Sequence, residues 1–255
     1  MSSEEIPHTR KNALAFFEKF LKQTDVRGKK VIDLSAGSGY IINQFHKAGA
    51  EVSLYDLFPD QNTMCPVQCQ QIDLQKKFPI DSATADYAIL GETIEHLPNQ
   101  YFFFQESARI LKPGGTLILT TPNSSSLRSR LSQFLMESEH YSTPAPNETD
   151  AFTKWPGSND GYFSKLFISG LHRLRTLAAI NGLKIKQVHR SPASSTSYLL
   201  LAWYPVLYYY SRKNKNRQVK NDPANREVFE EIFRLNTSVS VLTSKHLIVE
   251  WVRTP

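Results

Sequence analysis

The chain has 255 residues, of which 40% are hydrophobic and 21% charged, a composition that excludes a generally disordered protein and allows one large α/β domain. The formal net charge of +6 is a mild basic excess, which by itself fits a nucleic-acid partner, an anionic membrane surface or simple solubility. The two cysteines, Cys65 and Cys69, are too few for a disulfide framework and lack the further close ligands of a zinc site. We therefore expect free thiols in a reducing compartment.

The first twelve residues, MSSEEIPHTRKN, contain no apolar segment of the kind that a secretory signal needs. No stretch of the chain approaches the ~20 apolar residues that cross a bilayer. We expect a cytoplasmic protein, with association with a membrane surface as a further option.

The first half of the chain alternates helical and extended patterns. Helices are predicted over 11–23, 40–48 and 101–111. Strands are predicted over 31–34, 51–56, 67–73, 86–90 and 116–121, with a KPGG turn at 112–115. Strands that alternate with helices at this spacing indicate βαβ units and a parallel sheet.

The second half is less regular. Helices are predicted over 124–137 and 170–181, and strands over 183–190 and 241–252. The long connection at 138–165 predicts a lid or binding loop, and 191–239 is an aromatic and basic insertion. We predict a single domain over 1–255, with a seven-stranded, mostly parallel sheet, an antiparallel last strand and helices on both faces.

The strongest motif is VIDLSAGSG at 31–39, a strand that opens into a glycine turn before a helix. Gly37 and Gly39 lack the Cβ atom that would keep a ligand away from the backbone. The helix that follows offers free N–H groups and a partial positive charge. Asp33, at the end of the strand, can accept from an ammonium group or from the amides of the loop.

Two more acids follow predicted strands. Asp56 ends the second strand, about twenty residues after the loop, where a carboxylate can bind both ribose hydroxyls of an adenosine ligand. Asp73 ends the third strand, and its side chain or the backbone of Leu74 could meet an adenine amino group. Since the carboxyl ends of parallel strands share one edge of the sheet, these groups should converge there. The alternative for a lone Asp after a strand is a helix N-cap.

In this order, VIDLSAGSG, LYD, QID, DYAILGETIEHLPN and RILKPGGTLILTTPN resemble the class I S-adenosylmethionine-dependent methyltransferases. Through EHL, LKPGG and TTPN the chain is most similar to the bacterial ubiquinone-biosynthesis O-methyltransferase type. The resemblance is strong over 28–125 and loose over 165–190 and 240–253. It implies a Rossmann-like fold and S-adenosylmethionine as the cofactor.

Carried over by position, the resemblance implies a cofactor site of four parts. These are the methionine-side loop (Asp33, Ser35, Ala36, Gly37, Gly39), the ribose-side Asp56 and Leu57, the adenine-side Asp73 and Leu74, and the contact region Gly91 and Glu92. Ser35 stands where the family's loop has its first glycine, and we expect cofactor binding to survive this departure. A dehydrogenase is the rival interpretation, but the third glycine of G-x-G-x-x-G would fall at Ile42.

Methyl transfer from a sulfonium needs an aligned acceptor and, where required, removal of its proton. His96 is the first candidate for the general base because its ordinary pKa is near neutral, and Glu95 and His140 are further candidates. In the alternative interpretation, Glu95 and His96 cap or orient the local backbone. Glu92, Glu95 and His96 could also hold a divalent cation, although the reaction needs no metal and none is predicted.

We expect O-methylation of a small, apolar or lipid-like acceptor. Amino-methylating nucleic-acid enzymes carry an Asn/Asp-Pro-Pro-aromatic motif after the fourth strand, where this chain has LGET. A catalytically silent cofactor-binding or scaffold subunit and an RNA-directed methyltransferase are the alternatives.

The insertion begins with YLLLAWYPVLYYY at 198–210, in which Pro205 is expected to kink a helix. Residues 211–226 then hold six basic side chains and one acid. Aromatic residues beside a basic cluster suit a peripheral membrane contact through 195–226. The alternatives are a buried wall of the acceptor pocket with a solvated loop, and a nucleic-acid surface.

Overall fold

The computed structural model describes residues 8–139, 146–149, 151–154 and 161–255. The chain groups into two compact units. The first unit holds Met1–Thr121, Arg175–Gln187 and Ile248–Pro255, and the second unit holds Pro122–Leu174 and Val188–Leu247. The assignment of a single domain over the whole chain stays a prediction.

The main sheet is built from β1 (Lys30–Asp33), β2 (Glu51–Asp56), β3 (Cys69–Gln71), β4 (Ala85–Gly91), β5 (Leu111–Pro122), β8 (Leu183–His189) and β9 (His246–Arg253). The helices along these strands are α1 (His8–Gln23), α2 (Tyr40–Lys47), η1 (Pro59–Gln61), η2 (Ile94–His96), α3 (Gln100–Ile110) and α5 (Leu171–Ile180). The second unit contains α4 (Leu127–Met136), β6 (Phe152–Lys154), β7 (Gly161–Phe163), α6 (Ser195–Leu200), η3 (Leu201–Trp203), α7 (Tyr204–Asn221), η4 (Pro223–Asn225), α8 (Arg226–Asn236) and α9 (Val239–Thr243).

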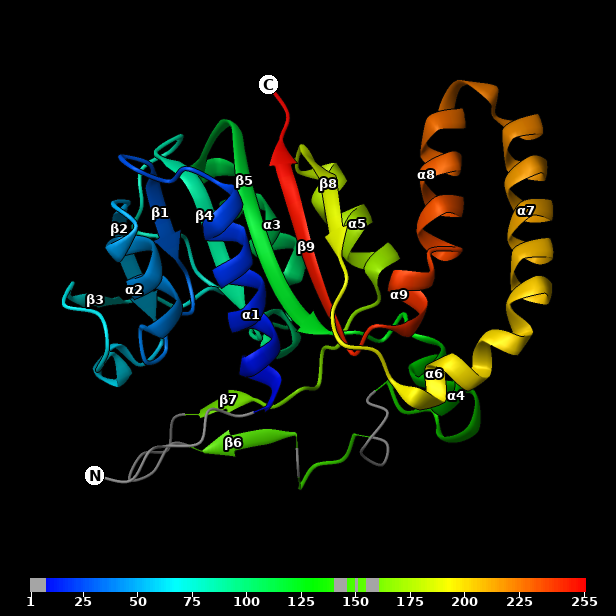
Figure 1. Cartoon of the computed structure of the whole chain (residues 1–255), viewed down its shortest axis with the longest axis horizontal. Helices are drawn as coiled ribbons and strands as arrows, with labels where there is room; N and C mark the ends of the chain where they lie inside the picture. The colour runs from blue at the N-terminus through cyan, green and yellow to red at the C-terminus, as the bar shows by residue number, and fades with distance from the viewer. Residues whose placement is uncertain (1–7, 140–145, 150, 155–160) are drawn as a thin grey trace. The chain divides into compact units, whose positions relative to one another are not determined.

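Within the described residues, seven strands form one sheet in the order β3-β2-β1-β4-β5-β9-β8. The neighbouring pairs from β3 to β5 are parallel, whereas Figure 1 shows β9 running opposite to β5 and β8, with α1 and α2 in front of the strands and α3 behind. The predicted fold class is therefore confirmed. The strand order reverses between β1 and β4, and ligands of such sheets bind at the carboxyl ends beside this reversal.

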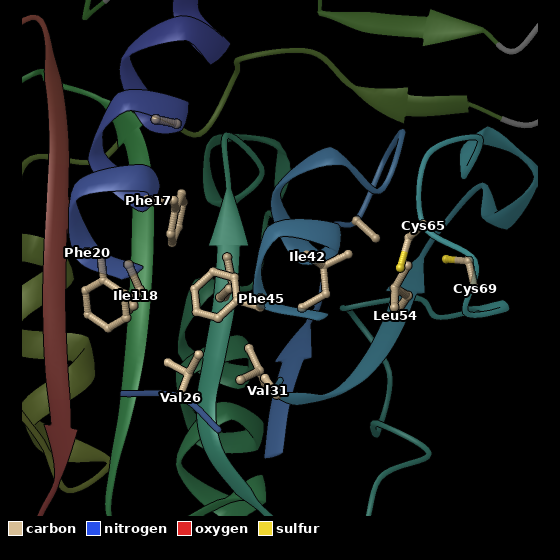
Figure 2. Packing of buried hydrophobic residues seen from close by; sticks show 14 residues of the cluster. Phe17, Phe20, Val26, Val31, Ile42, Phe45, Leu54, Cys65, Cys69 and Ile118 are labelled. Atoms are coloured by element: carbon tan, nitrogen blue, oxygen red, sulfur yellow. The ribbon is translucent and has the colours of Figure 1, made fainter. Parts of the chain in front are cut away.

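Helices α1 and α2 cover the same strands through aromatic side chains. Phe17 and Phe20 of α1 lie 5.9 Å and 6.1 Å, between ring centroids, from Phe45 of α2. Figure 2 shows these rings in one apolar cluster with Val31 of β1 and Ile118 of β5. Since Phe17, Phe45, Val31 and Ile118 are almost fully buried, this apolar layer fixes α2, and with it the loop before α2, on the sheet.

The sequence predicts a turn at KPGG (112–115) before the fifth strand, but these residues lie inside β5. Ala85 pairs with Leu111 and Tyr87 pairs with Thr116, so the register shifts by the extra residues of β5. Gly114 takes the left-handed conformation at φ 79° that this bulge needs.

Two predictions in the last third of the chain are wrong. The strand expected over 241–252 begins only at His246, and Val239–Thr243 is helical because the Ser238 hydroxyl caps the Val241 N–H. Pro205 does not kink a helix. It lies in the first turn of α7, where proline's missing N–H costs no hydrogen bond.

The predicted lid at 138–165 is described only in part. Strands β6 and β7 form an antiparallel pair within it, with Phe152 opposite Phe163. Residues 140–145, 150 and 155–160 lie outside the described residues, so the lid stays a prediction. Among the helices of the described ranges, none combines the length and apolar character needed to cross a membrane.

Candidate functional site

A cavity of about 570 Å³ opens in the first unit where β1, β2 and β4 end. This volume lies within the ~300–1,000 Å³ typical of small-molecule and cofactor sites. The lining residues are Ala13, Leu14, Asp33, Ser35, Ala36, Gly37, Ser38, Tyr40, Ile41, Asp56, Gln61, Met64, Ile89, Gly91, Glu92, Thr93 and Thr120. The predicted convergence of Asp33, Asp56 and the glycine loop on one edge is thus present.

The Asp56 carboxylate accepts a hydrogen bond directly from the glycine loop. Its Oδ2 accepts the Gly37 N–H at 2.8 Å, and its Oδ1 accepts the Phe58 N–H at 2.9 Å. Each carboxylate oxygen carries a second lone pair. The carboxylate that holds the loop can therefore also accept from a ligand in the cavity.

Gly39 has a packing role. It is buried with φ 78°, and a Cβ atom there would collide with Asn62 Oδ1. The Asn62 amide is itself held by the backbone of Cys65 and Val67, so it cannot yield easily. Gly39 does not line the cavity, and its predicted contact with the cofactor stays a prediction.

Ser35, the departure from the family's glycine, joins the loop to β4. Its Oγ accepts the Gly91 N–H at 2.8 Å. Both residues line the cavity, so this hydrogen bond ties two of its walls together. A glycine at this position would have no side chain, whereas the Ser35 hydroxyl links the loop to β4 by a hydrogen bond.

Asp33 is 3% exposed, and its Oδ1 accepts the Ser35 N–H at 3.0 Å. Burial raises the pKa of Asp33 to about 7, because the Ser35 N–H, which favours the charged form, does not offset the lost hydration. The nearby Asp56 carboxylate raises it further. The cavity thus holds a carboxyl group whose ionisation responds to a cation bound beside it.

Glu92 and Thr120 shape the wall at the end of β4. Glu92 has φ 49°, a left-handed conformation that non-glycine residues rarely take, and its N–H donates to the Thr120 carbonyl at 2.9 Å. The Thr120 side chain is 1% exposed, and its hydroxyl has no hydrogen-bond partner among the described residues. A buried hydroxyl in a cavity wall is a ready contact for a ligand.

Leu57, Asp73 and Leu74 do not line the cavity. Asp73 Oδ1 accepts the Gln75 N–H at 3.0 Å, and Oδ2 lies 3.2 Å from Lys76 Nζ. These contacts form a local turn and not the helix N-cap of the alternative interpretation, because residues 74–76 are not helical. The adenine-side role of Asp73 and Leu74 stays a prediction.

The three candidate bases are placed differently. Glu95 is fully buried, and its Oε2 accepts the Thr121 hydroxyl at 3.0 Å. Neither Glu95 nor His96, both in η2, lines the cavity, and His140 lies outside the described residues. The Glu95 contact is structural, and all three catalytic roles stay predictions. Within the described ranges, no three His, Cys, Asp or Glu side chains group as a metal site would need.

Sequence reasoning missed much of the lining. Ser38 and Tyr40 flank the glycine turn and could have been included from their positions alone. Thr120 lies on β5 beside β4, and its role follows only from the sheet order. Ala13 and Leu14 come from α1, and only tertiary packing brings them to the cavity.

Residues 7–206 match the model of the family described as "Methyltransferase domain", which covers most of the chain. The chain belongs to this family. The resemblance inferred from the motifs is therefore confirmed, and this methyltransferase family supports the predicted enzyme class and S-adenosylmethionine as the cofactor.

The named relatives match this methyltransferase at low sequence identity and over only part of its length. A ubiquinone biosynthesis O-methyltransferase of Xanthomonas oryzae is 28% identical over 108 residues, 39% of this chain and 45% of that protein. The human mitochondrial ubiquinone biosynthesis O-methyltransferase is 25% identical over 169 residues, 61% of this chain and 45% of that protein. The chain thus spans about half the length of these relatives.

Solved structures share the fold at low identity. A putative S-adenosylmethionine-dependent methyltransferase from Listeria monocytogenes superposes with a TM-score of 0.55 at 14% identity, covering 96% of this chain and 100% of that one. A protein from Pyrococcus horikoshii, PH0226, gives a TM-score of 0.54 at 20% identity, covering 73% of this chain and 87% of that one. These likenesses establish the fold of the methyltransferase.

Proposed function

We propose that this methyltransferase transfers the methyl group of S-adenosylmethionine to an oxygen atom of a small, apolar or lipid-like acceptor. The observation that carries the proposal is the Asp56 carboxylate, which holds the glycine loop through the Gly37 N–H at 2.8 Å and lines the same cavity. This arrangement is the one that a nucleoside ligand needs at the carboxyl edge of a parallel sheet.

The cavity residues suit a donor with a positive charge and a ribose. Asp33 and Asp56 both line the cavity and would face the ammonium and sulfonium charges and the ribose hydroxyls of the donor. The backbone of the loop from Ser35 to Gly37 approaches the cavity without large side chains. When bound, S-adenosylmethionine supplies a methyl group already activated by its sulfonium.

The chain's part in the reaction is to align the acceptor and remove its proton. Glu92 and Thr93 line the cavity where β4 ends. The predicted bases Glu95 and His96 follow within three residues, so one short segment could both align the acceptor and remove its proton. His96 remains the first candidate for the base, since the ordinary pKa of histidine is near neutral and suits proton transfer at neutral pH.

The apolar part of the lining supports the class of acceptor. Apolar side chains from α1, α2, β4 and the segment after η1 contribute to the wall, namely Ala13, Leu14, Ile41, Met64 and Ile89. An acceptor that buries an apolar surface against them would be favoured by about 25 cal/mol per Å². The printed names of the relatives, ubiquinone biosynthesis O-methyltransferases, agree with an apolar acceptor methylated on oxygen.

The test combines binding with transfer. Titration calorimetry of the protein with S-adenosylmethionine should give one site per chain, and incubation of a cell extract with methyl-labelled donor should put label into a product extractable by organic solvent. Fragmentation mass spectrometry of that product, together with release of labelled iodomethane by hot hydriodic acid, then identifies an oxygen-bound methyl group.

Binding without label transfer would replace this proposal with a silent cofactor-binding subunit. Label that is confined to RNA would replace it with an RNA-directed enzyme. Absence of binding would overturn both the donor and the site.

A further inference from the structure

The second unit exposes large apolar side chains along one short stretch. They are Tyr198 and Leu199 of α6, Trp203 of η3, and Val206, Tyr209 and Tyr210 of α7, with exposed fractions between 47% and 79%. We call these six residues the aromatic patch. Soluble proteins rarely leave so many neighbouring apolar side chains in water without a partner surface. The interpretation of 198–210 as a buried wall is therefore wrong, since none of its side chains is buried.

The inner face of α7 is already occupied by α8. Figure 1 shows α7 and α8 side by side, and the Tyr208 ring packs at 5.4 Å from the Phe233 ring, between centroids. Lys215 Nζ lies 5.4 Å from the centroid of the same ring, and Asn236 donates to the Ser211 hydroxyl. These contacts fix which side of α7 faces away from its neighbour.

The opposite face of α7 changes from apolar to cationic along the length of the helix. Val206, Tyr210, Lys213, Arg217 and Lys220 follow one another at spacings of three or four residues, so they form one line on the helix. The line is apolar in its first half and cationic in its second half, and all five residues are exposed. A single partner surface in contact with this line must accept both characters.

All the charged side chains of the α6–α7 segment, residues 195–221, have the same sign. Residues 195–221 contain five basic side chains and no acidic one. The five are Arg212, Lys213, Lys215, Arg217 and Lys220. A second copy that packed symmetrically through the same face would bring like charges together, which disfavours a dimer here. The partner must instead be negatively charged and must accept apolar side chains.

We propose that the α6–α7 segment docks the protein on an anionic lipid bilayer, with the aromatic patch in the interfacial region and Lys213, Arg217 and Lys220 at the headgroup phosphates. Tyrosine and tryptophan favour the bilayer interface, and basic residues are attracted to an anionic surface. A nucleic acid would satisfy the cations and stack on the aromatic rings, but it offers nothing to the aliphatic Leu199 and Val206.

This docking goes beyond the proposed methyl transfer and does not depend on it, because every residue involved lies in the second unit and outside the cavity lining. A failure to bind vesicles would leave donor binding untouched, and a failure to bind the donor would leave vesicle binding untouched. The two proposals are thus tested separately.

The experiment is flotation of the full chain with vesicles of phosphatidylcholine, with and without phosphatidylglycerol. We expect binding to the anionic vesicles only, weakened by salt. The double variant Lys213→Glu/Arg217→Glu should lower the partition coefficient at least about tenfold, from about 1 kcal/mol for each charge. The matched control Lys19→Glu/Lys184→Glu makes the same change of net charge on exposed residues of the first unit and should bind as the parent does.

The aromatic patch has its own readout. Trp203 is 66% exposed, and its emission should shift to shorter wavelength on anionic vesicles. The shift should disappear in Trp203→Phe, which keeps an aromatic side chain. Leu199→Ser should weaken binding, with unchanged thermal unfolding because Leu199 is 79% exposed.

Equal partition of the parent and the Lys213→Glu/Arg217→Glu variant would overturn the proposal. Binding to a short single-stranded RNA with no partition into vesicles would also overturn it and would assign the face to nucleic acid.

Discussion

The Gly37 N–H donates to Asp56 Oδ2 at 2.8 Å, so the carboxylate at the end of β2 holds the turn that follows β1. Nineteen residues separate the two in sequence. The hydrogen bond brings the loop and the acid to one cavity before any ligand arrives, and a preformed site loses less conformational freedom on binding. Asp56 thus has two tasks, to order the loop and to present a negative charge to a ligand.

Substitution Asp56→Asn should weaken binding of the donor. One amide oxygen replaces two carboxylate oxygens, so the Gly37 and Phe58 N–H groups can no longer both be satisfied in the present way, and the negative charge is lost. We expect about 10- to 100-fold weaker binding of S-adenosylmethionine by calorimetry, from the ~1.5–3 kcal/mol of a hydrogen bond to a charged group. Asp60→Asn, an exposed acid of η1 outside the cavity lining, is the control and should bind as the parent does. Unchanged affinity of Asp56→Asn would remove Asp56 from the site.

The raised pKa of Asp33, about 7, predicts pH-dependent donor binding. A bound cation favours the carboxylate and lowers this pKa, so binding releases a proton below about pH 7. The affinity for S-adenosylmethionine should therefore rise as pH increases from 6 to 8 and level off above the pKa. In the unliganded protein the sign is opposite for folding: between the ordinary value of 3.8 and about 7 the folded chain retains a proton that the unfolded chain has lost, so stability falls as pH rises through this window.

Calorimetry in buffers of different ionisation enthalpy measures the proton released on binding, and denaturant titration at several pH values measures the folding effect. Asp33→Asn should remove both dependences. A proton release that persists in Asp33→Asn would assign the titration to another group.

The strands of the first half and their parallel arrangement could be predicted from the sequence, because each of these strands is bounded by its own local signal. The glycine turn after β1 and the acid at the end of β2 are features of short segments, and the parallel sheet follows from the alternation of the strands with helices. The direction of a side chain does not follow from such a signal. Asp73 ends a predicted strand as Asp56 does, yet its carboxylate turns to the Gln75 N–H and Lys76.

Long-range contacts account for the other differences. The alternating pattern at 241–245 fits a strand, but the Ser238 cap and the amide of Asn123, which donates to the Val241 and Ser244 carbonyls, hold the segment in a helix and a turn. Asn123 lies 118 residues from Val241, beyond the reach of any local pattern. Likewise, the contribution of α1 to the cavity depends on how Phe17 packs against Phe45.

Ser35→Ala should cost stability even though alanine is smaller and apolar. The Gly91 N–H loses its acceptor at 2.8 Å, and this partly buried group then has no replacement in the cavity wall. We expect the free energy of unfolding to fall by about 1 kcal/mol in denaturant titration. The control is Ser38→Ala in the same loop, since the Ser38 hydroxyl makes no hydrogen bond in the described part of the chain. Equal stability of the two variants would show that the link to β4 contributes nothing.

Neighbouring threonines on β5 offer the sharpest separation of ligand contact from folding. The Thr120 hydroxyl is buried at the cavity without a partner among the described residues, whereas the Thr121 hydroxyl donates to Glu95 at 3.0 Å. Thr120→Val keeps the shape of the side chain and removes an unsatisfied group, so the free energy of unfolding should stay equal or rise while ligand affinity falls. Thr121→Val removes one partner of a fully buried carboxylate, so the free energy of unfolding should fall by about 1–3 kcal/mol while donor affinity stays unchanged.

Denaturant titration and calorimetry with S-adenosylmethionine, followed by transfer assays with the identified acceptor, measure both quantities on both variants. If Thr120→Val binds donor and acceptor as the parent does, the hydroxyl serves no ligand. If Thr121→Val instead abolishes transfer at unchanged stability, the contact of Glu95 is not purely structural, because the Thr121 hydroxyl would then orient a carboxylate that acts on the acceptor's proton. The predicted catalytic role of Glu95 would then gain its first direct support.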